Sequence, residues 1–171
     1  LFSRSLGKLG AVYVTTLSCA LTVILNLYNF YVVYFTPVTY FFNLGPWIQV
    51  ALIQVDWEFM LDTLSTSMLL MVSLISGLVH LYSFSYMKTD PHFLRFISYL
   101  SLFTFFMFVI VSAANLVVFF VGWEGVGICS YLLINFWYTR GQANKAALKA
   151  LLMNRVGDVG FIIGVVLLFA L

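Results

Sequence analysis

The sequence carries very little charge for its length. Of its 171 residues only 8% are Asp, Glu, Lys or Arg, whereas 63% are hydrophobic and 19% are aromatic. Soluble domains average about 25% charged residues, so eight basic and six acidic side chains cannot cover the surface of a soluble domain of this size. The net charge of +2 also excludes a nucleic-acid-binding protein, which needs clustered Lys and Arg. The composition predicts a membrane protein.

Cysteine is equally scarce. Cys19 and Cys129 both lie in apolar runs, and two such residues form neither a disulfide framework nor a metal site. The sequence contains no phosphate-binding loop, dinucleotide fingerprint, metal-ligand cluster or nucleophile triad. We therefore expect this chain to bind no cofactor, and we expect any redox chemistry to take place elsewhere.

Long apolar runs dominate what is present. A helix needs about 20 apolar residues to cross the ~30 Å hydrocarbon core of a bilayer, and five stretches are long enough. The strands of a β-barrel alternate in units of ~10 residues, whereas these runs are apolar on every side. We predict an all-α membrane protein with one transmembrane domain. Its predicted spans are residues 11–35, 63–87, 96–114, 115–138 and 144–171.

Basic residues gather in alternate connections between these spans. They precede the first span, occur in the connection 88–95, and recur around the start of the fifth span at 140–149. The connection 36–62 instead contains three acidic residues and no basic one. By the positive-inside rule, we expect the N-terminus and the basic connections to face the compartment in which the chain is made.

The connection 36–62 is the one long loop. Residues 43–46, Asn-Leu-Gly-Pro, predict a turn, and residues 55–59 alternate apolar and acidic side chains as in a strand. Two interpretations remain open at this point. The loop either contains a small β-hairpin at the outer interface or forms an amphipathic segment anchored there by Trp47 and Trp57.

Glu124 lies almost midway along the fourth predicted span. A charged carboxylate at the bilayer centre costs on the order of 2.5–3.5 kcal/mol, so we expect Glu124 to face the protein interior and to handle a proton. The flanking Gly122, Gly125 and Gly127 weaken the helix locally and let another backbone approach closely. The alternative is a permanently protonated Glu124 that is hydrogen-bonded to a neighbouring helix.

The fifth predicted span contains Arg155 and Asp158, which are three residues apart and can pair on one helix face. The pair either takes part in proton transfer or simply reduces the cost of placing two charges in the membrane. Lys145 and Lys149 form a basic stripe at the start of this helix. For them, anchoring at the interface and a role in proton entry are both open.

His80 lies in the inner third of the second predicted span. It is either a hydrogen-bonded interior residue or, because histidine ionises near neutral pH, a proton relay. Gly160 and Gly164, four residues apart, indicate helix packing rather than chemistry. The candidate site residues are therefore Glu124, Asp158, Arg155, His80 and Lys149.

Several motifs occur in a fixed order along nearly the whole chain. They are HLYS at 80–83, DPH at 90–92, GWEGVG at 122–127, ANKAA at 143–147 and NRVGD at 154–158. Together they resemble subunit 5 of respiratory complex I, NADH:ubiquinone oxidoreductase. They are also similar to the large subunit of multi-subunit sodium/proton antiporters.

The resemblance implies an antiporter-like helix bundle that translocates protons while NADH, FMN, iron–sulfur clusters and ubiquinone bind elsewhere in the complex. It implies that Glu124 is the proton-handling carboxylate, that Arg155 and Asp158 are the charged pair of the next helix, and that the lysine partner of Glu124 lies outside this sequence. The family is several hundred residues longer, so we expect an N-terminal fragment of the subunit. The alternatives are a sodium/proton antiporter subunit and a structural scaffold that does not pump.

The same resemblance implies the partners of the chain. They are the other membrane-arm subunits, a second chain that supplies the rest of subunit 5, and membrane lipids such as cardiolipin. The abundance of Phe, Tyr, Leu and Asn and the absence of an initiator methionine favour an organelle genome. We therefore expect the chain in the mitochondrial inner membrane, with its N-terminus and basic loops in the matrix.

Overall fold

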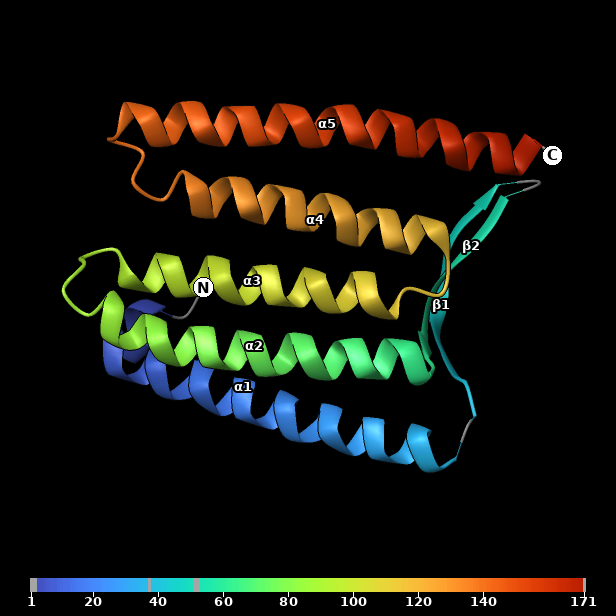
Figure 1. The fold of residues 1–171 in the computed structure, drawn as a ribbon, viewed down its shortest axis with the longest axis horizontal. Coiled ribbons are helices and arrows are strands. Elements are labelled where there is room, and N and C mark those ends of the chain that lie inside the picture. The colour runs from blue at the N-terminus through green and yellow to red at the C-terminus, as the bar shows by residue number, and fades with distance from the viewer. Residues whose placement is uncertain (1–2, 37, 51–52, 171) are drawn as a thin grey trace.

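The computed structural model describes residues 3–36, 38–50 and 53–170 of the chain. Five helices in this part are long and apolar enough to cross a membrane, which confirms the predicted multi-pass, mostly helical fold. A two-stranded antiparallel hairpin connects the first two helices along the chain (Figure 1). The elements are α1 (Ser3–Phe35), β1 (Tyr40–Val50), β2 (Ile53–Leu61), α2 (Thr63–Tyr86), α3 (Phe93–Ser112), α4 (Leu116–Ile134) and α5 (Gly141–Ala170).

The helix ends differ from the predicted spans by a few residues. α1 begins at Ser3 and bends at Gly7, whose φ of 67° is in the left-handed region that glycine adopts easily. α4 ends at Ile134 rather than 138, because Phe136 leaves the helix and packs in a small core with Met87 and Phe93. α5 begins three residues before the predicted start, and the predicted end at Leu171 lies outside the described residues.

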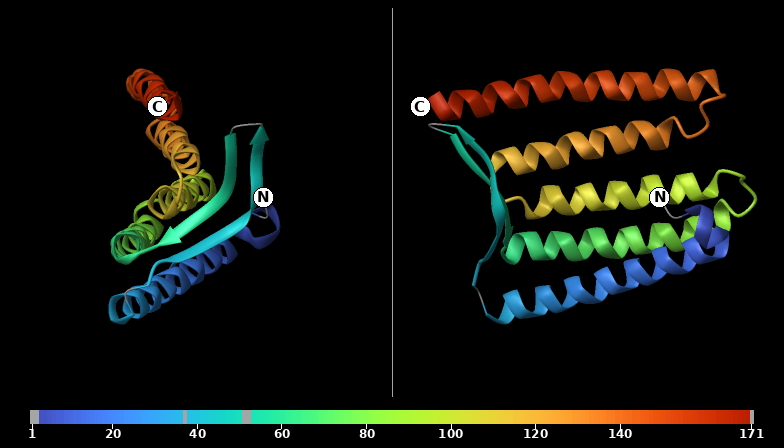
Figure 2. Two further views of the ribbon diagram at one scale, coloured as in Figure 1. Left: turned by 90° about the vertical axis from the view of Figure 1, so that its right-hand side faces the viewer. Right: turned by 180° about the vertical axis from the view of Figure 1, so that it is seen from behind.

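The five helices lie side by side in one row, in sequence order and with alternating direction (Figures 1 and 2). Each packs against the helix before it, and α1 also touches α3. At one edge of the row α5 packs against α4. Side chains of different helices therefore meet in the seams between neighbouring helices.

Glycines set the close approach of α3 to α4. A Cβ atom on Gly122 would lie 2.9 Å from the backbone nitrogen of Ile110, and one on Gly125 would overlap the ring of Phe106. Both glycines are buried. This confirms the prediction that the glycines beside Glu124 let a neighbouring helix approach closely.

The loop between α1 and α2 forms a hairpin, which settles the two open interpretations in favour of strands. Its register runs from Tyr40 opposite Leu61 to Val50 opposite Ile53. The turn predicted at 43–46 is wrong, because these residues lie inside β1, where the register shifts. Gly45 has a φ of 129° and its N–H donates to the Asn43 side chain at 2.7 Å, so the same residue types make a bulge.

The hairpin lies across the ends of the helices (Figure 2) and is bonded to the turn between α3 and α4. The Ala114 N–H donates to the Glu58 carbonyl at 3.1 Å, and the Asn115 side-chain amide donates to the Asp56 carbonyl at 2.9 Å. The Asn115 oxygen also accepts the Val118 N–H at 2.8 Å, which caps α4. The start of the helix that carries Glu124 is thereby fixed to the hairpin.

The two ends of the helix row differ in charge. The connections from α2 to α3 and from α4 to α5 lie at one end with Lys88, Arg95 and Arg140, while the hairpin with Asp56 and Glu58 lies at the other. Arg95 stacks on the rings of Phe136 and Tyr138 at 5.2 and 5.5 Å, so it also holds the α4–α5 connection against α3. The basic and acidic connections that alternate along the sequence thus lie at opposite ends of the helix row.

Candidate proton-handling site

Charged side chains meet where α4 packs against α5. Nη1 of Arg155 lies 2.6 Å from Oε1 of Glu124 on the neighbouring helix. The same nitrogen lies 3.9 Å from Oδ2 of Asp158, one turn further along α5. One guanidinium nitrogen therefore contacts both carboxylates, and the contact with Glu124 is the shorter.

Asp158 is held in place by the residue before Glu124. The indole N–H of Trp123 donates to Oδ1 of Asp158 at 3.0 Å, and Asp158 is only 4% exposed. Trp123 stacks in turn on the ring of Phe119. Because one carboxylate oxygen is bonded to the indole, the other is left facing Arg155.

Sequence reasoning did not single out Trp123. The signal was present, because an indole N–H inside a membrane needs an acceptor and water is absent there. Its position next to Glu124 directs it toward α5, although the sequence does not say which acceptor it reaches.

Little space remains among these side chains. The cavity that they enclose measures about 10 Å³, which is about the smallest volume that can hold one water molecule. Asn154 closes one side, where a Cβ atom on Gly127 would lie 2.8 Å from its amide nitrogen. The third glycine of the motif thus sets the approach of α5, as the other two set that of α3.

The cluster is open on one side. The side chain of Asp158 is 5% exposed and that of Glu124 22%, but that of Arg155 is 58% exposed. A guanidinium that faces hydrocarbon is strongly unfavourable. In a membrane the open side of Arg155 therefore has to meet water, lipid headgroups or further protein.

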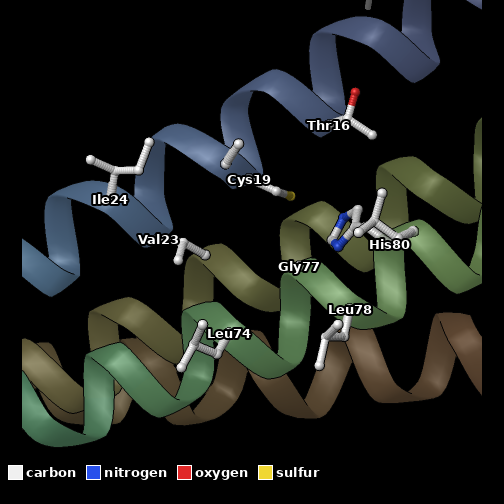
Figure 3. Close-up of a pocket in the computed structure, with 10 residues that line it drawn as sticks. Thr16, Cys19, Val23, Ile24, Leu74, Gly77, Leu78 and His80 are labelled. Atoms are coloured by element: carbon white, nitrogen blue, oxygen red, sulfur yellow. The ribbon is translucent and has the colours of Figure 1, made fainter.

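His80 belongs to a second polar group, which lies between α2 and α3. It is 1% exposed, and its ring nitrogens lie 2.8 Å from the Ser76 carbonyl oxygen and 3.2 Å from the Ser101 hydroxyl. Across the helix pair it faces Cys19 and Thr16 of α1 (Figure 3). The structure does not place His80 in the Glu124 cluster, because α3 lies between α2 and α4 in the row.

Two family models match the sequence. Residues 47–97 match the model described as NADH-Ubiquinone oxidoreductase (complex I), chain 5 N-terminus, and residues 113–171 match NADH:quinone oxidoreductase/Mrp antiporter, TM. Over 165 residues the chain is 52% identical to NADH-ubiquinone oxidoreductase chain 5 of Allomyces macrogynus, an alignment that covers 94% of this chain and 25% of that protein. This chain belongs to the chain 5 family.

Other chain 5 proteins match as closely. The chain is 53% identical over 166 residues to that of Rhizopus stolonifer, and 48% identical over 170 residues to that of Arabidopsis thaliana. These alignments cover 97% and 99% of this chain but 25% of each relative. The chain thus spans about a quarter of the length of the chain 5 proteins it matches. The second family model covers both α4 and α5, and so includes the whole Glu124 cluster.

In this chain 5 family member the cluster contains one contact that was not expected. The predicted pair of Arg155 and Asp158 is present at 3.9 Å, but Arg155 makes a second and shorter contact with Glu124, 31 residues earlier. Glu124 therefore does have a basic partner within this chain. Helical spacing reveals neighbours on one helix only, so a partner on the next helix does not show in the sequence pattern.

The remaining candidates lie away from the cluster. Lys145 and Lys149 are exposed on the first turns of α5, and the structure places neither beside Glu124. A Cβ atom on Gly160 or Gly164 would meet nothing within 4 Å in the described part of the chain. The helix packing predicted for these two glycines is therefore not formed within these residues.

Proposed function

We propose that this chain is part of a proton-translocating membrane-arm subunit of an NADH:ubiquinone oxidoreductase, with Glu124 as the proton carrier. The observation that carries the proposal is that the guanidinium of Arg155 contacts both Glu124 and Asp158 where two transmembrane helices pack together. The identity of the enzyme complex is taken from the names of the relatives, which are NADH-ubiquinone oxidoreductase chain 5 proteins. NADH, FMN, iron–sulfur clusters and ubiquinone bind to other parts of that complex.

Because a second carboxylate is present, Arg155 can form its ion pair with either Glu124 or Asp158. When the guanidinium lies on Glu124, the ionised carboxylate is stabilised by its counter-charge. When the guanidinium moves to Asp158, which Trp123 already orients, Glu124 loses that counter-charge and takes up a proton. Asp158 and Arg155 thus act on the proton of Glu124 without carrying it themselves.

The electrostatic energies are large enough for this role. Two unit charges ~4 Å apart interact by about 4 kcal/mol at an effective dielectric constant of 20. Moving one proton across a membrane potential of ~150–200 mV requires about 3.5–4.6 kcal/mol. The movement of one guanidinium between two carboxylates is therefore comparable to the work of one translocation step.

The open side of Arg155 indicates where the rest of the machinery lies. Its exposed guanidinium requires a polar neighbour, and we assign this neighbour to the remainder of subunit 5 or an adjacent membrane-arm subunit. A lysine from that neighbour would compete with Arg155 for Glu124. We place the complex in the mitochondrial inner membrane, with the Lys/Arg-rich end of the helix row in the matrix and cardiolipin at its interfaces.

Replacement of Glu124 by Gln tests the proposal, because the amide keeps the shape of the side chain but cannot exchange a proton. The assembled complex is reconstituted in liposomes, and the proton gradient is measured against NADH oxidation. We expect Glu124→Gln to abolish pumping, whereas the matched control Glu58→Gln, on the hairpin, pumps normally. Normal pumping by Glu124→Gln would refute the proposal.

The same preparation separates the alternative functions. A scaffold predicts that Glu124→Gln changes assembly while each assembled complex still pumps. A sodium/proton antiporter, which the description of the second family model also names, predicts sodium-dependent transport and no redox subunits in the purified complex. Mass spectrometry of the co-purifying chains identifies which complex is present.

A further inference from the structure

Glu124 and Asp158 lie close enough to compete for one proton. Both contact the same atom, Nη1 of Arg155, at 2.6 and 3.9 Å respectively. Neighbouring carboxylates repel each other when both are ionised, so such a pair holds one proton more easily than two separate groups would. The single positive charge of Arg155 offsets only one of the two negative charges. Which carboxylate binds the proton therefore depends on the other groups around each of them.

Burial and ion pairing alone favour a proton on Asp158. Its side chain is 5% exposed and that of Glu124 is 22% exposed, and a carboxyl group that is removed from water favours its neutral form. The guanidinium nitrogen also lies closer to Glu124 than to Asp158, so it stabilises the negative charge of Glu124 more. If nothing else acted on the pair, Asp158 would bind the proton and Glu124 would stay ionised.

The indole of Trp123 acts in the opposite direction. Its N–H donates to Oδ1 of Asp158 at 3.0 Å. An indole N–H can only donate, so it bonds an ionised carboxylate more strongly than it bonds a carboxylic acid. Hydrogen bonds to charged groups typically shift an equilibrium by about 10- to 100-fold. In the part of the chain that the structure describes, Glu124 accepts a hydrogen bond from Arg155 only.

Aromatic packing holds Trp123 in this position. Its ring stacks on Phe119, one turn earlier in α4, with the ring centroids 6.3 Å apart. Phe119 stacks in turn on Phe161 of α5 at 5.7 Å. The indole is thus held against α5 by ring contacts, whereas the guanidinium of Arg155 is carried by a long side chain with many rotamers. When the guanidinium moves, the hydrogen bond from Trp123 to Asp158 remains in place.

We propose that Trp123 is a positioning residue that keeps Asp158 ionised, so that the proton binds Glu124. This inference rests on the function proposed above and explains how the less buried carboxylate becomes the carrier. Glu124 binds one proton when Arg155 leaves it and releases that proton when Arg155 returns, and no electron is transferred. A proton on Asp158 would be enclosed between the two helices, whereas Glu124 is the more exposed of the two groups. The hydrogen bond thus directs the proton to the carboxylate from which it leaves more easily.

Trp123→Phe tests the inference in the assembled complex. Phenylalanine keeps a ring that stacks on Phe119 but has no N–H. The matched control is Trp137→Phe, because the indole of Trp137 donates to Oδ2 of Asp90 at 3.3 Å at the Lys/Arg-rich end of the helix row. The same substitution there removes the same kind of bond outside the cluster. If Trp123→Phe does not assemble, Trp123→Met takes its place, since methionine fills irregular space and also lacks a donor.

Infrared spectroscopy locates the proton. The carbonyl stretch of a protonated carboxyl group is separate from the bands of ionised carboxylates, and it is recorded as the difference between NADH-driven and resting membranes. Two preparations carry a heavy carbon isotope in the side-chain carboxyl group, one in all glutamates and the other in all aspartates. The label that shifts the band to lower frequency identifies the residue type that binds the proton. Protons moved per NADH oxidised are measured in liposomes with the same complexes.

In the wild type and in Trp137→Phe, we expect the glutamate label to shift the band and Glu124→Gln to remove it. In Trp123→Phe, we expect the aspartate label to shift the band instead, and Asp158→Asn, added to this variant, to remove it. The distribution between the two carboxylates then changes by about 10- to 100-fold. The ratio of protons to NADH falls in Trp123→Phe and stays normal in Trp137→Phe. A purely structural role for Trp123 would lower assembly without moving the band from glutamate to aspartate.

The outcomes separate this inference from the function on which it rests. A band that still shifts with the glutamate label in Trp123→Phe overturns the role of Trp123 and leaves Glu124 as the carrier. A wild-type band that Glu124→Gln does not remove, or no such band at all, overturns the role of Glu124 and the inference with it.

Discussion

Removal of Arg155 alone should destabilise the complex more than removal of Arg155 together with Glu124. Arg155→Gln leaves the carboxylates of Glu124 and Asp158 without the cation that contacts both of them. In the double variant, Glu124→Gln removes one of these two charges as well. Breaking a buried ion pair by deleting one partner typically costs more than deleting both. We therefore expect the wild type to be the most stable, the double variant to be intermediate and Arg155→Gln to be the least stable.

The dielectric surroundings of the pair set the size of this effect. Charges ~4 Å apart are coupled by about 1 kcal/mol in bulk water and by about 4 kcal/mol at an effective dielectric constant of 20. Glu124 is 22% exposed and Asp158 5%, but Arg155 is 58% exposed, so α4 and α5 shield the cluster only in part. We expect a coupling energy between these two values, because the exposed side of Arg155 is open to screening. A coupling of about 4 kcal/mol corresponds to a change of up to ~10³-fold in the inactivation rate, compared with about fivefold for a solvated pair.

The assay is thermal inactivation of the assembled complex in its membrane, for the wild type, both single variants and the double variant. The coupling energy is the departure from additivity of the logarithms of the inactivation rates. Arg155→Lys is the control, because it keeps the charge but loses the planar fork that reaches two carboxylates; it should lie between wild type and Arg155→Gln. Additive single effects, or a coupling no larger than about 1 kcal/mol, would refute the buried pair.

Two further predictions concern packing and capping. Gly125→Ala should destabilise the complex by about 1–3 kcal/mol, because the added methyl overlaps the ring of Phe106. Gly160→Ala, with open space around it, should be neutral or should stabilise the complex by up to about 1 kcal/mol. Equal inactivation rates for the two variants would contradict the close helix contact. Asn115→Ala should cost about 1 kcal/mol by uncapping α4, and it should loosen the hairpin by removing the bond to the Asp56 carbonyl. Hydrogen exchange of the hairpin amides checks the second effect, and unchanged protection would count against it.

The helices could be predicted from the sequence because hydropathy averaged over about 20 residues depends little on any single side chain. Their ends could not be. Phe136 looks like part of a membrane span, but it packs against Met87 and Phe93 outside α4. Likewise, Gly45 and Pro46 are typical of both a turn and a bulge. The alternating pattern at 55–59 correctly indicated a strand.

The residues of the candidate site and the Arg155–Asp158 pair were predictable, but the contact of Arg155 with Glu124 was not. Glu124, Arg155 and Asp158 stand out in apolar spans because placing a charged side chain in the membrane is energetically unfavourable. Which of them touch depends on how α5 turns its faces toward α4, and this is set by contacts such as that between Gly127 and Asn154. The same dependence explains why Trp123 was missed. For His80, the hydropathy pattern indicated its depth in the span but not the hydroxyls of α3 around it.

The helix row described above also bears on how the chain is built during synthesis. Because each helix packs mainly on the one made just before it, a newly inserted segment finds its partner already in the bilayer. Contacts between sequence neighbours form quickly, since little chain entropy is lost in closing short connections. Biogenesis can thus proceed by adding one helix at a time to a growing edge, and α5, which follows α4 along the chain, brings Arg155 to Glu124 once α4 is in place.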